Sequence, residues 1–479
     1  MENLATQKPL KMNLKRTFII GFAFFGILLL WQVYDSWCPT LLTELFKKAL
    51  NTNDKNVQYL VGIMMAIDNL AALILLPIFG RLSDKTHTRI GKRMPYILIG
   101  TFVCAVAFPF IPVFFHYNNI VGFIIMMAIV IIFMMMYRNP AVALMPDLTP
   151  KPLRSKANGI INIMGYIGGL FAMLVGMVFV LSEYLGTKLN PDGTTAPFTW
   201  AHNNIWALEM PFIVASLLMV ISAAVLFFLI KENKIKEEIA DDLRRGEKMS
   251  EAADKVDDDK PMTRANKTML FLILGAVFFW FMADNGIATF MGNYTVYYLG
   301  ASTVSNMINT IIGGVGSVAG FALGGFIASK IGRKWTVFGG LGISLLSYII
   351  WIIGTFTFLK GAAGSGSFPV IIWVIWLLKG FGMSLVHLNS FPMVVELCNA
   401  KKIGAFTGYY YAASMAAQTI TPIALGSLLL IEGLNWGFLP VYASICLIAA
   451  ITIFFFVKSA KTSKTKIAKG LEGLGADQD

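Results

Sequence analysis

Long apolar runs recur along the whole sequence, and they restrict the solvent in which the chain can fold. A bilayer core about 30 Å thick needs about 20 apolar residues in a helix that crosses it. Runs of this length occur at about 17–40, 57–80, 95–115, 119–145, 157–182, 206–230, 268–298, 302–328, 335–358, 369–391, 404–431 and 437–457. Because lipid cannot hydrogen-bond the backbone, runs this long are expected to be helices. We predict an all-α integral membrane protein with twelve transmembrane helices.

A single long charged stretch, residues 231–267, divides these runs into two sets of six. It has helical propensity but almost no apolar face, so we interpret it as a solvated linker. The predicted organisation is an N-terminal segment (1–16), a first six-helix bundle (17–230), this linker, a second six-helix bundle (268–457) and a C-terminal tail (458–479).

The distribution of basic residues predicts the orientation of the chain. If the N-terminus is cytoplasmic, the outer segments hold only five of the 39 Lys and Arg residues, namely Lys47, Lys48, Lys55, Lys188 and Lys360. Basic residues concentrate on the cytoplasmic side of membrane proteins. We therefore expect a multi-pass protein of the cell membrane with both termini in the cytoplasm. The same bias explains the formal net charge of +12 without a nucleic-acid partner.

No cofactor or metal site is predicted from the sequence. The four cysteines, Cys38, Cys104, Cys398 and Cys446, are far apart and form no CxxC or Cys/His cluster. Small buried thiols are the better interpretation. Because the water-accessible segments contain no nucleophile triad, metal cluster or phosphate loop, we do not expect an enzyme.

A short basic loop with glycines follows the second apolar run of each half. The first copy contains Gly80, Asp84, Arg89, Gly91 and Arg93, and the second contains Gly332 and Arg333, with Ala328 where the first has Asp84. The repeated spacing resembles the signature loop of the major facilitator superfamily, whose members are two six-helix halves related by pseudo-symmetry. The resemblance implies a role in gating and stability rather than substrate contact. Ala328 predicts a weaker clamp in the second half.

The first and fourth helices of the two halves also share residues at a fixed offset. Trp31 and Asp35 match Trp280 and Asp284, 249 residues later, and Arg138 matches Lys379, 241 residues later. A Trp and an Asp four residues apart share a helix face. In the superfamily, helices 1, 4, 7 and 10 line the central cavity, so the resemblance places these residues at that cavity.

Five charged residues fall inside apolar runs: Asp35, Asp68, Arg138, Asp284 and Lys379. A charge at the bilayer centre costs at least about 2.5–3.5 kcal/mol, so it is expected to face a cavity or a partner. Burial disfavours an ionised carboxyl group, so we predict that Asp68 carries a proton and that Arg138 resets it. The alternative is a static ion pair that joins two helices.

Asp35, Asp284 and Lys379 are predicted to contact the substrate, and further contacts are predicted from residue type and helical spacing. Trp31 and Trp280 are candidates for stacking on the apolar face of a sugar, although most Trp in membrane proteins pack or lie at the interface. Asn285 and Gln418 are candidate hydrogen-bonding residues that can equally join helices.

The segment from Gly80 to Gly100 resembles the glycoside–pentoside–hexuronide cation symporter family. The stretch from Arg138 through Pro140 to Asp147, Leu148 and Thr149 resembles its sucrose-transporter-like branch. The order of proline, small residues and an Asp-Leu pair is the same there. Two departures are visible: the helix 4 Arg of plant sucrose carriers corresponds to Val142 here, and the two sodium-binding acids of melibiose-type members correspond to Ala72 and Leu76. The second departure favours protons over sodium.

Together these patterns predict a proton-coupled symporter of a glycoside that works by alternating access. A disaccharide such as maltose or sucrose is the substrate that the resemblance implies. Two alternatives stay open: a proton-driven exporter of amphipathic compounds, and a sugar sensor that does not transport. We expect a monomer surrounded by lipid, with a sugar and a coupling cation as its ligands.

Overall fold

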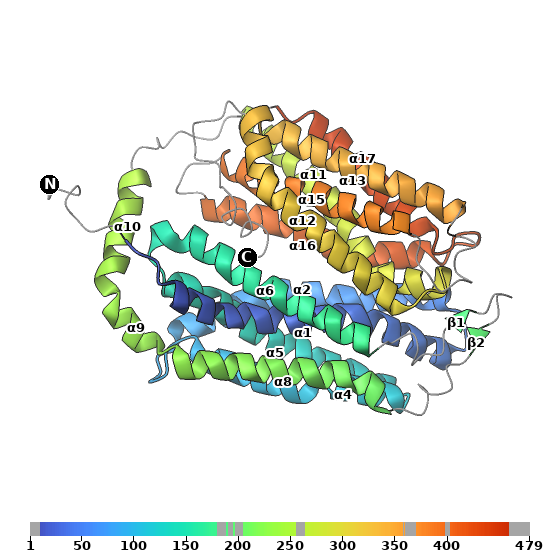
Figure 1. Ribbon diagram of the computed structural model, residues 1–479, viewed down its shortest axis with the longest axis horizontal. Coiled ribbons are helices and arrows are strands. Elements are labelled where there is room, and N and C mark those ends of the chain that lie inside the picture. The colour runs from blue at the N-terminus through green and yellow to red at the C-terminus, as the bar shows by residue number, and fades with distance from the viewer. Residues whose placement is uncertain are drawn as a thin grey trace.

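The computed structural model describes residues 10–179, 188–189, 195–196, 205–254, 264–357, 359, 370–397 and 403–458. Long helices run alongside one another in two groups (Figure 1). The first group contains α1 (Leu14–Leu50), α2 (Gln58–Lys85), α3 (Met94–Ala107), α4 (Phe110–His116), α5 (Ile120–Asp147), α6 (Arg154–Val178) and α8 (Ile205–Leu229). The second contains α11 (Arg264–Asn293), α12 (Thr303–Ile331), α13 (Arg333–Phe356), α15 (Val370–Val395), α16 (Ile403–Leu428) and α17 (Phe438–Phe455).

Eleven spans in the part of the chain that the structure describes are long and apolar enough to cross a membrane, with α3 and α4 together forming one of them. The remaining long helix is α16, of 26 residues. Its apolar character is diluted by polar residues such as Ser414 and Thr421, both of which are buried. These polar groups face protein rather than lipid, so α16 completes the second set of six crossings that the sequence predicts.

Each group of helices has its own apolar core. One cluster of buried residues runs from Ile20 to Ile230 and includes a single residue of the second group, Met307. The other cluster runs from Leu270 to Val457. The two groups contact each other through three helix pairs, α2 with α16, α6 with α12, and α1 with α11. They therefore pack as two bodies that share a narrow interface.

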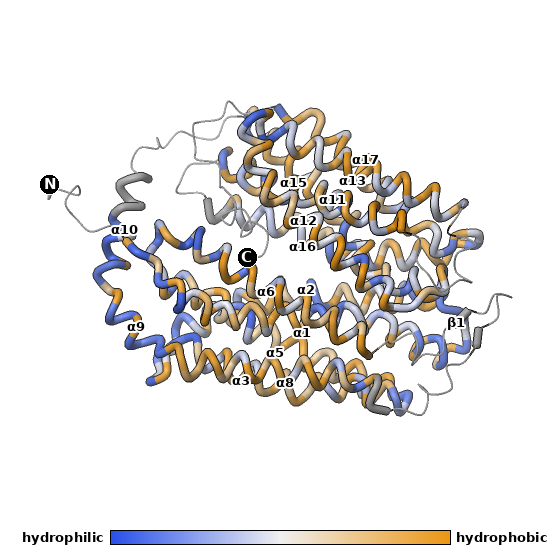
Figure 2. Tube along the Cα trace, in the orientation of Figure 1, coloured by the Kyte–Doolittle hydropathy of each residue, from blue (hydrophilic) through white to orange (hydrophobic). Residues whose placement is uncertain are grey.

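Short elements mark the two ends of the helices. At one end, which we call the linker end, lie α9 (Glu232–Glu238) and α10 (Ala240–Asp254), the hydrophilic helices on the left of Figure 2. At the other end, which we call the strand end, lie the paired strands β1 (Lys188–Leu189) and β2 (Thr195–Ala196) and the short helices η2 (Asp54–Val57) and η4 (Tyr294–Tyr298). η3 (Lys151–Leu153) lies between α5 and α6.

The segment predicted as a solvated linker is packed at its start. Glu232, in the first turn of α9, is fully buried, and one of its carboxylate oxygens accepts a hydrogen bond from the backbone nitrogen of Arg93 at 3.0 Å. Gly246 of α10 lies against the backbone of Lys151 in η3. α9 and α10 therefore lie against the first group of helices rather than free in solvent. Residues 255–263 lie outside the described part.

Cys38, Cys104 and Cys446 are buried free thiols, as expected. Cys398 and Lys360 lie outside the residues that the structure describes, and the Lys188 side chain is likewise not described.

Candidate functional site

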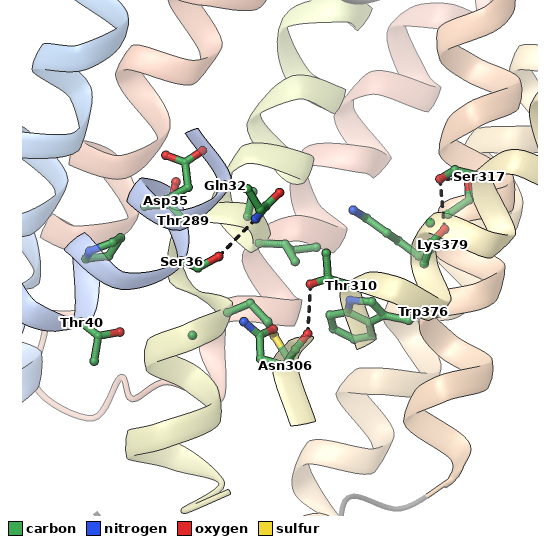
Figure 3. Close-up of a pocket in the computed structure, with 18 residues that line it drawn as sticks. Gln32, Asp35, Ser36, Thr40, Thr289, Asn306, Thr310, Ser317, Trp376 and Lys379 are labelled. Carbon is green, nitrogen blue, oxygen red and sulfur yellow. Dashed lines mark hydrogen bonds between the residues drawn. The ribbon is translucent and has the colours of Figure 1, made fainter. Parts of the chain in front are cut away.

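A cavity of about 310 Å³ lies between the two groups of helices (Figure 3). One wall is α1, from the first group, and the other walls are α11, α12 and α15, from the second. Its polar lining consists of Gln32, Asp35, Ser36, Thr40, Thr289, Asn306, Thr310, Ser317 and Lys379. Carboxylate, amine, amide and hydroxyl groups from both groups of helices therefore meet in one space.

On α1, the lining residues form a single stripe. Asp35, Ser36, Pro39 and Thr40 follow Gln32 by three, four, seven and eight residues, which places all five on one helix face. Gln32 Nε2 donates a hydrogen bond to Ser36 Oγ at 3.2 Å. The sequence analysis selected only Asp35 from this stripe. The other residues of the stripe could have been predicted from the helical spacing of polar residues within this apolar run.

α12 contributes a second polar stripe that the sequence analysis missed. Asn306, Thr310 and Ser317 line the cavity, and Thr310 and Ser317 are separated from Asn306 by one and three helical turns. Thr310 Oγ1 donates to the carbonyl of Asn306 at 3.0 Å, and Ser317 Oγ donates to the carbonyls of Gly313 and Gly380 at 3.1 and 3.2 Å. These bonds hold the hydroxyl oxygens in place and leave them able to accept hydrogen bonds.

Lys379 on α15 lines the cavity, and its Nζ forms an ion pair with the carboxylate of Asp284 on α11. Their side chains are 20% and 30% exposed, respectively. Asp284 is not part of the cavity lining, but its ion pair fixes the charged end of Lys379. The structure thus joins two predicted site residues, one from each of two helices, as an ion pair.

Asp68 on α2 is 3% exposed, and neither of its carboxylate oxygens has a hydrogen-bond partner among the described residues. The groups that interact with it electrostatically are the Tyr34 hydroxyl and the Asp35 carboxylate, both on α1. The Tyr34 hydroxyl also lacks a geometrically good hydrogen bond. Because a buried carboxylate without a counter-charge is costly, this position favours a neutral, protonated acid. Asp35 lines the cavity and also interacts with Asp68, so it connects Asp68 with the cavity.

Arg138 is not among the groups that interact with Asp68. Its neighbour on α5, Asn139, donates from Nδ2 to the carbonyl of Leu76 on α2 at 2.5 Å. Leu76 follows Asp68 by eight residues, which is about 12 Å along a helix. The predicted pairing of Asp68 with Arg138 is therefore absent from the interactions of Asp68, and the neighbour of Arg138, Asn139, contacts α2 about two turns beyond Asp68.

The three tryptophans nearest the site have different environments. Trp31 is half-buried and stacks on Tyr34, with 5.8 Å between ring centroids. Trp280 is 0% exposed and packs edge-on against Phe454 in the core of the second group. We leave Trp280 out of the proposed substrate contacts, because its indole has no surface to offer. Trp376, which the sequence analysis did not select, lines the cavity instead.

Asn285 and Gln418 lie outside the cavity lining. The Oδ1 atom of Asn285 is buried and has no hydrogen-bond partner among the described residues. The backbone carbonyl of Gln418 on α16 accepts a hydrogen bond from Asn69 Nδ2 on α2 at 3.4 Å. In this conformation Gln418 belongs to the contact between the two groups of helices.

The first basic loop forms a charged clamp at the linker end. The Arg93 side chain, 6% exposed, bonds Asp84 at 2.5 Å, Asp147 at 2.9 Å and Ser83 Oγ at 2.5 Å. Lys92 adds a contact to Asp147 at 3.1 Å. Asp147 lies 54 residues beyond Arg93 in the sequence, at the end of α5. The clamp therefore joins α2, α3 and α5.

Three other predicted loop residues contribute to the loop in different ways. Gly91 has φ = +115°, a backbone conformation that side chains other than hydrogen disfavour. A Cβ atom at Gly80 would contact the amide of Asn139 on α5, so Gly80 permits a close approach of two helices. The Arg89 side chain is exposed, and its backbone carbonyl accepts from Asn233 Nδ2 of α9 at 3.2 Å.

The second basic loop forms a simpler clamp. Gly332 has φ = +84° and connects α12 directly to α13. Arg333 forms an ion pair with Glu396, just beyond the end of α15. Ala328, at the position equivalent to Asp84, is a buried apolar residue. One ion pair therefore replaces the branched set of contacts of the first half, in line with the weaker clamp that the sequence predicts.

Hydrogen bonds between the two groups of helices gather at the strand end. Thr40 Oγ1 donates to Asn293 Oδ1 at 2.9 Å, and Asn293 Nδ2 donates to Thr43 Oγ1 at 3.1 Å and to Gln58 Oε1 at 3.2 Å. All four side chains are at most 1% exposed. We call this set the strand-end latch. Nearby, Tyr297 donates to Glu44 at 2.6 Å, Trp436 donates to Asp54 at 2.6 Å, and Lys55 donates to the carbonyl of Leu434 at 2.6 Å.

Asn293→Ala is expected to loosen this end. The substitution leaves the buried Thr40 and Gln58 groups without a partner, and each such group costs about 1–3 kcal/mol. Spin labels at the exposed positions Asn51 and Glu432, one on each group of helices, report the separation by pulsed electron resonance. We expect the long-distance population to rise about tenfold. Asn56→Ala, which removes an exposed amide bonded to Thr52 within one group, is the control. An unchanged distance distribution in the Asn293 variant would contradict the role of the latch.

The sequence matches the family model of the Major Facilitator Superfamily over residues 23–361 and 273–476. Lactose permease of Lactobacillus helveticus is 23% identical over 472 residues, covering 94% of this chain and 69% of the permease.

Among solved structures, the inward open conformation of the xylose transporter XylE from E. coli aligns with a TM-score of 0.63 and 17% identity, over 96% of this chain and 98% of that one. A POT family transporter in complex with 5-aminolevulinic acid aligns with a TM-score of 0.62 and 12% identity, over 92% and 95%. Likeness at this level of identity shows a common fold of two six-helix halves.

Proposed function

Because this chain belongs to the Major Facilitator Superfamily, we propose that it carries a glycoside across the cell membrane together with a proton. Membership makes it a membrane transporter rather than an enzyme. The substrate that we propose is a disaccharide such as maltose or sucrose. The name of its relative, a lactose permease, supports a sugar as the cargo.

The polar cavity between the two groups of helices is the observation that carries the proposal. Sugar hydroxyls both donate and accept hydrogen bonds, and the lining supplies acceptors and donors on opposite walls. Asp35 and Gln32 lie on α1, and Asn306 and Lys379 lie on the far side (Figure 3). Trp376 lines the same cavity and, at 6% exposure, adds a small apolar contact. Pockets that bind small ligands combine such anchors with a few convergent polar groups.

Alternating access needs one end closed and the other open. The strand-end latch joins the two groups at one end, and the groups diverge toward the linker end (Figure 1). Basic residues such as Lys85, Lys92 and Arg93 lie at the linker end, so the positive-inside tendency favours the cytoplasm there. We propose that both termini are cytoplasmic and that this conformation faces inward.

We propose that Asp68 carries the coupling proton and that Asp35 connects it with the cavity. A proton on Asp68 removes the cost of a buried charge, and a sugar hydroxyl bonded to Asp35 would alter the charge that Asp68 meets. Asn139, the neighbour of Arg138 on α5, bonds the carbonyl of Leu76, which follows Asp68 by about 12 Å toward the linker end of α2. We propose that the Arg138 cation on this side of Asp68 favours release of the proton to the cytoplasm.

Two other functions make different predictions for the same cavity. An exporter of amphipathic compounds requires an apolar binding surface, and the hydroxyl, amide and charged lining of this cavity counts against it. A sensor would bind sugar without moving it. Uptake measurements distinguish these functions directly.

The test is uptake of labelled glycosides by the purified chain in proteoliposomes. We expect a disaccharide to accumulate when the outside is made acidic, and not when a sodium gradient is imposed at equal pH. Accumulation driven by sodium alone would refute proton coupling. Binding without any uptake would favour the sensor, and efflux of apolar cations in place of sugar uptake would favour the exporter.

Gly314 lines the cavity, and a Cβ atom there would have no heavy atom within 4 Å. Gly314→Leu is therefore expected to fill part of the cavity without disturbing helix packing. We expect the KM for the disaccharide to rise at least about tenfold, since a clash with substrate removes one or more kcal/mol of binding. A monosaccharide should be less affected.

Gly342 provides the matched control for this prediction. It is an exposed glycine of α13 with equally open surroundings, and it lies outside the cavity. Gly342→Leu should leave KM unchanged. Equal losses in the two variants would mean that leucine acts on the helices rather than on the substrate.

A further inference from the structure

The charges at the cavity are unequally balanced. Of the residues that line it, only Asp35 and Lys379 carry an ionisable group. Lys379 reaches into the cavity toward Gln32 (Figure 3), yet its Nζ is already paired with Asp284, which is not one of the lining residues. A ligand therefore meets Lys379 as half of a neutral pair.

Asp35 has no such compensation. The ionisable groups that interact with it electrostatically are Asp68, Tyr34 and Cys38, and none of these is a cation. The Asp284 carboxylate interacts with His387 and Tyr348 in addition to Lys379. When Asp284 is ionised, the Lys379–Asp284 pair has no net charge. Asp35 is then the remaining ionisable group of the lining, and it is neutral or negative.

We propose that Asp284 sets the charge selectivity of the carrier: by neutralising Lys379, it makes the cavity select uncharged glycosides over glycosides that carry a carboxylate. This inference rests on the proposed function, since it assumes that the cavity binds a glycoside. Two like charges a few ångströms apart repel each other strongly in a partly dry site. A hexuronide carboxylate would meet Asp35 without a free cation to balance it.

The chemistry of Lys379 makes the proposal specific. An unpaired lysine ammonium in a cavity is a good partner for a carboxylate, because charge-assisted hydrogen bonds are about twice as strong as neutral ones. In this chain the Asp284 carboxylate already occupies that position. Removing the Asp284 charge should therefore free Lys379 and admit an acidic sugar, which is a gain rather than a loss of binding.

The experiment compares two competitors that differ only at one carbon. Methyl glucoside and methyl glucuronide are titrated against uptake of a labelled neutral disaccharide into proteoliposomes at fixed pH. For the unsubstituted protein we expect the glucuronide to compete at least about tenfold more weakly than the glucoside. For Asp284→Asn we expect this ratio to shift at least about tenfold toward the glucuronide.

Four further variants make the result interpretable. Asp284→Glu keeps the charge and should keep the original ratio. Lys379→Asn removes the cation and should shift the ratio the other way. Asp284→Asn combined with Lys379→Asn removes both charges of the pair, and should cancel the shift seen with Asp284→Asn alone. Glu209→Gln removes a buried acid of α8 outside the cavity and should leave the ratio unchanged.

The outcomes separate this inference from the proposed function. If no neutral glycoside is bound or taken up, the proposed function fails and the inference falls with it. If neutral uptake occurs but the two competitors are equally effective, or the ratio in Asp284→Asn does not move, only the charge selectivity is wrong. If Asp284→Asn does not fold, the opposite shift with Lys379→Asn decides, and its absence overturns the inference.

Discussion

Asp68→Asn is expected to abolish uphill accumulation of the sugar while leaving exchange of sugar across the membrane intact. An amide has nearly the shape of a protonated carboxyl group but cannot release a proton. Asp68 is 3% exposed and has no hydrogen-bond partner among the described residues, so it meets the requirement for an acid that is neutral when buried. Fixing it in the neutral form should uncouple the sugar from the proton gradient.

The measurement pairs two assays on the same vesicles. Accumulation is followed under an imposed pH gradient, and counterflow is followed with sugar on both sides and no gradient. We expect the first to be lost and the second to keep at least half of its rate.

Glu209 offers a matched control for Asp68. It is also a buried acid, 5% exposed, whose carboxylate oxygens lack hydrogen-bond partners among the described residues, and it lies on α8 outside the cavity. Glu209→Gln should preserve accumulation. If accumulation survives in Asp68→Asn, Asp68 is structural and another acid couples the proton. If it is lost in both variants, loss of a buried carboxylate in general is the cause.

Arg93→Ala is expected to cause the largest loss of stability among single substitutions at the linker end. It removes the bonds from one nearly buried guanidinium to Asp84, Asp147 and Ser83. After the substitution Asp147 keeps Lys92 as a partner and Asp84 is 59% exposed, so neither acid is left buried without a cation. The expected cost is that of losing hydrogen bonds to charged groups, about 1.5–3 kcal/mol each. We expect a marked fall in the thermal unfolding midpoint in detergent, together with loss of transport.

Two other arginines calibrate this effect. Arg89 lies in the same loop but is exposed, so Arg89→Ala should change the midpoint little. Arg333→Ala removes the single ion pair to Glu396 in the second half and should fall between the two. A midpoint for Arg93→Ala close to that for Arg89→Ala would mean that the clamp contributes little to stability.

The sequence predicts the two six-helix halves and the signature loops because these depend on the length of apolar runs and on local spacing. The internal repeat also pointed to Asp35 and Lys379, both of which the structure places at the cavity. Their roles in binding stay predictions. The same repeat pointed to Trp280, which is fully buried. A fixed offset identifies equivalent residues, but it does not determine the depth at which each helix borders the cavity.

The cavity borders the equivalent helices α1 and α11 at different depths. The cavity borders α1 at residues 32–40 and α11 at residues 287–292. With the offset of 249 residues, the equivalent stretch of α11 would begin at residue 281. The contact on α11 therefore starts more than one turn nearer the strand end, beyond the reach of Trp280. A fixed offset predicts equal depths only if the two halves are perfectly symmetric. In this conformation they are not.

The long-range ion pairs could not be predicted from the sequence either. Asp147 and Glu396 stand at helix ends and have the local character of solvated carboxylates. They pair with Arg93 and Arg333, which are 54 and 63 residues away. Glu232, 139 residues from Arg93, is also a long-range partner, as it accepts a hydrogen bond from the Arg93 backbone nitrogen. Which charged ends meet depends on how the helices pack, and helical periodicity contains no information about that.

The strand-end latch consists of neutral hydrogen bonds among Thr40, Thr43, Gln58 and Asn293 rather than ion pairs. When such a latch opens, water replaces each partner, so the net cost is only about 0.5–1.5 kcal/mol per bond. Opening an apolar seal would cost about 25 cal/mol for every Å² of surface exposed to water, and no new hydrogen bond to water would offset that cost. The two conformations can therefore be nearly equal in free energy. Binding of one proton or one sugar is then enough to reverse their populations at every turnover.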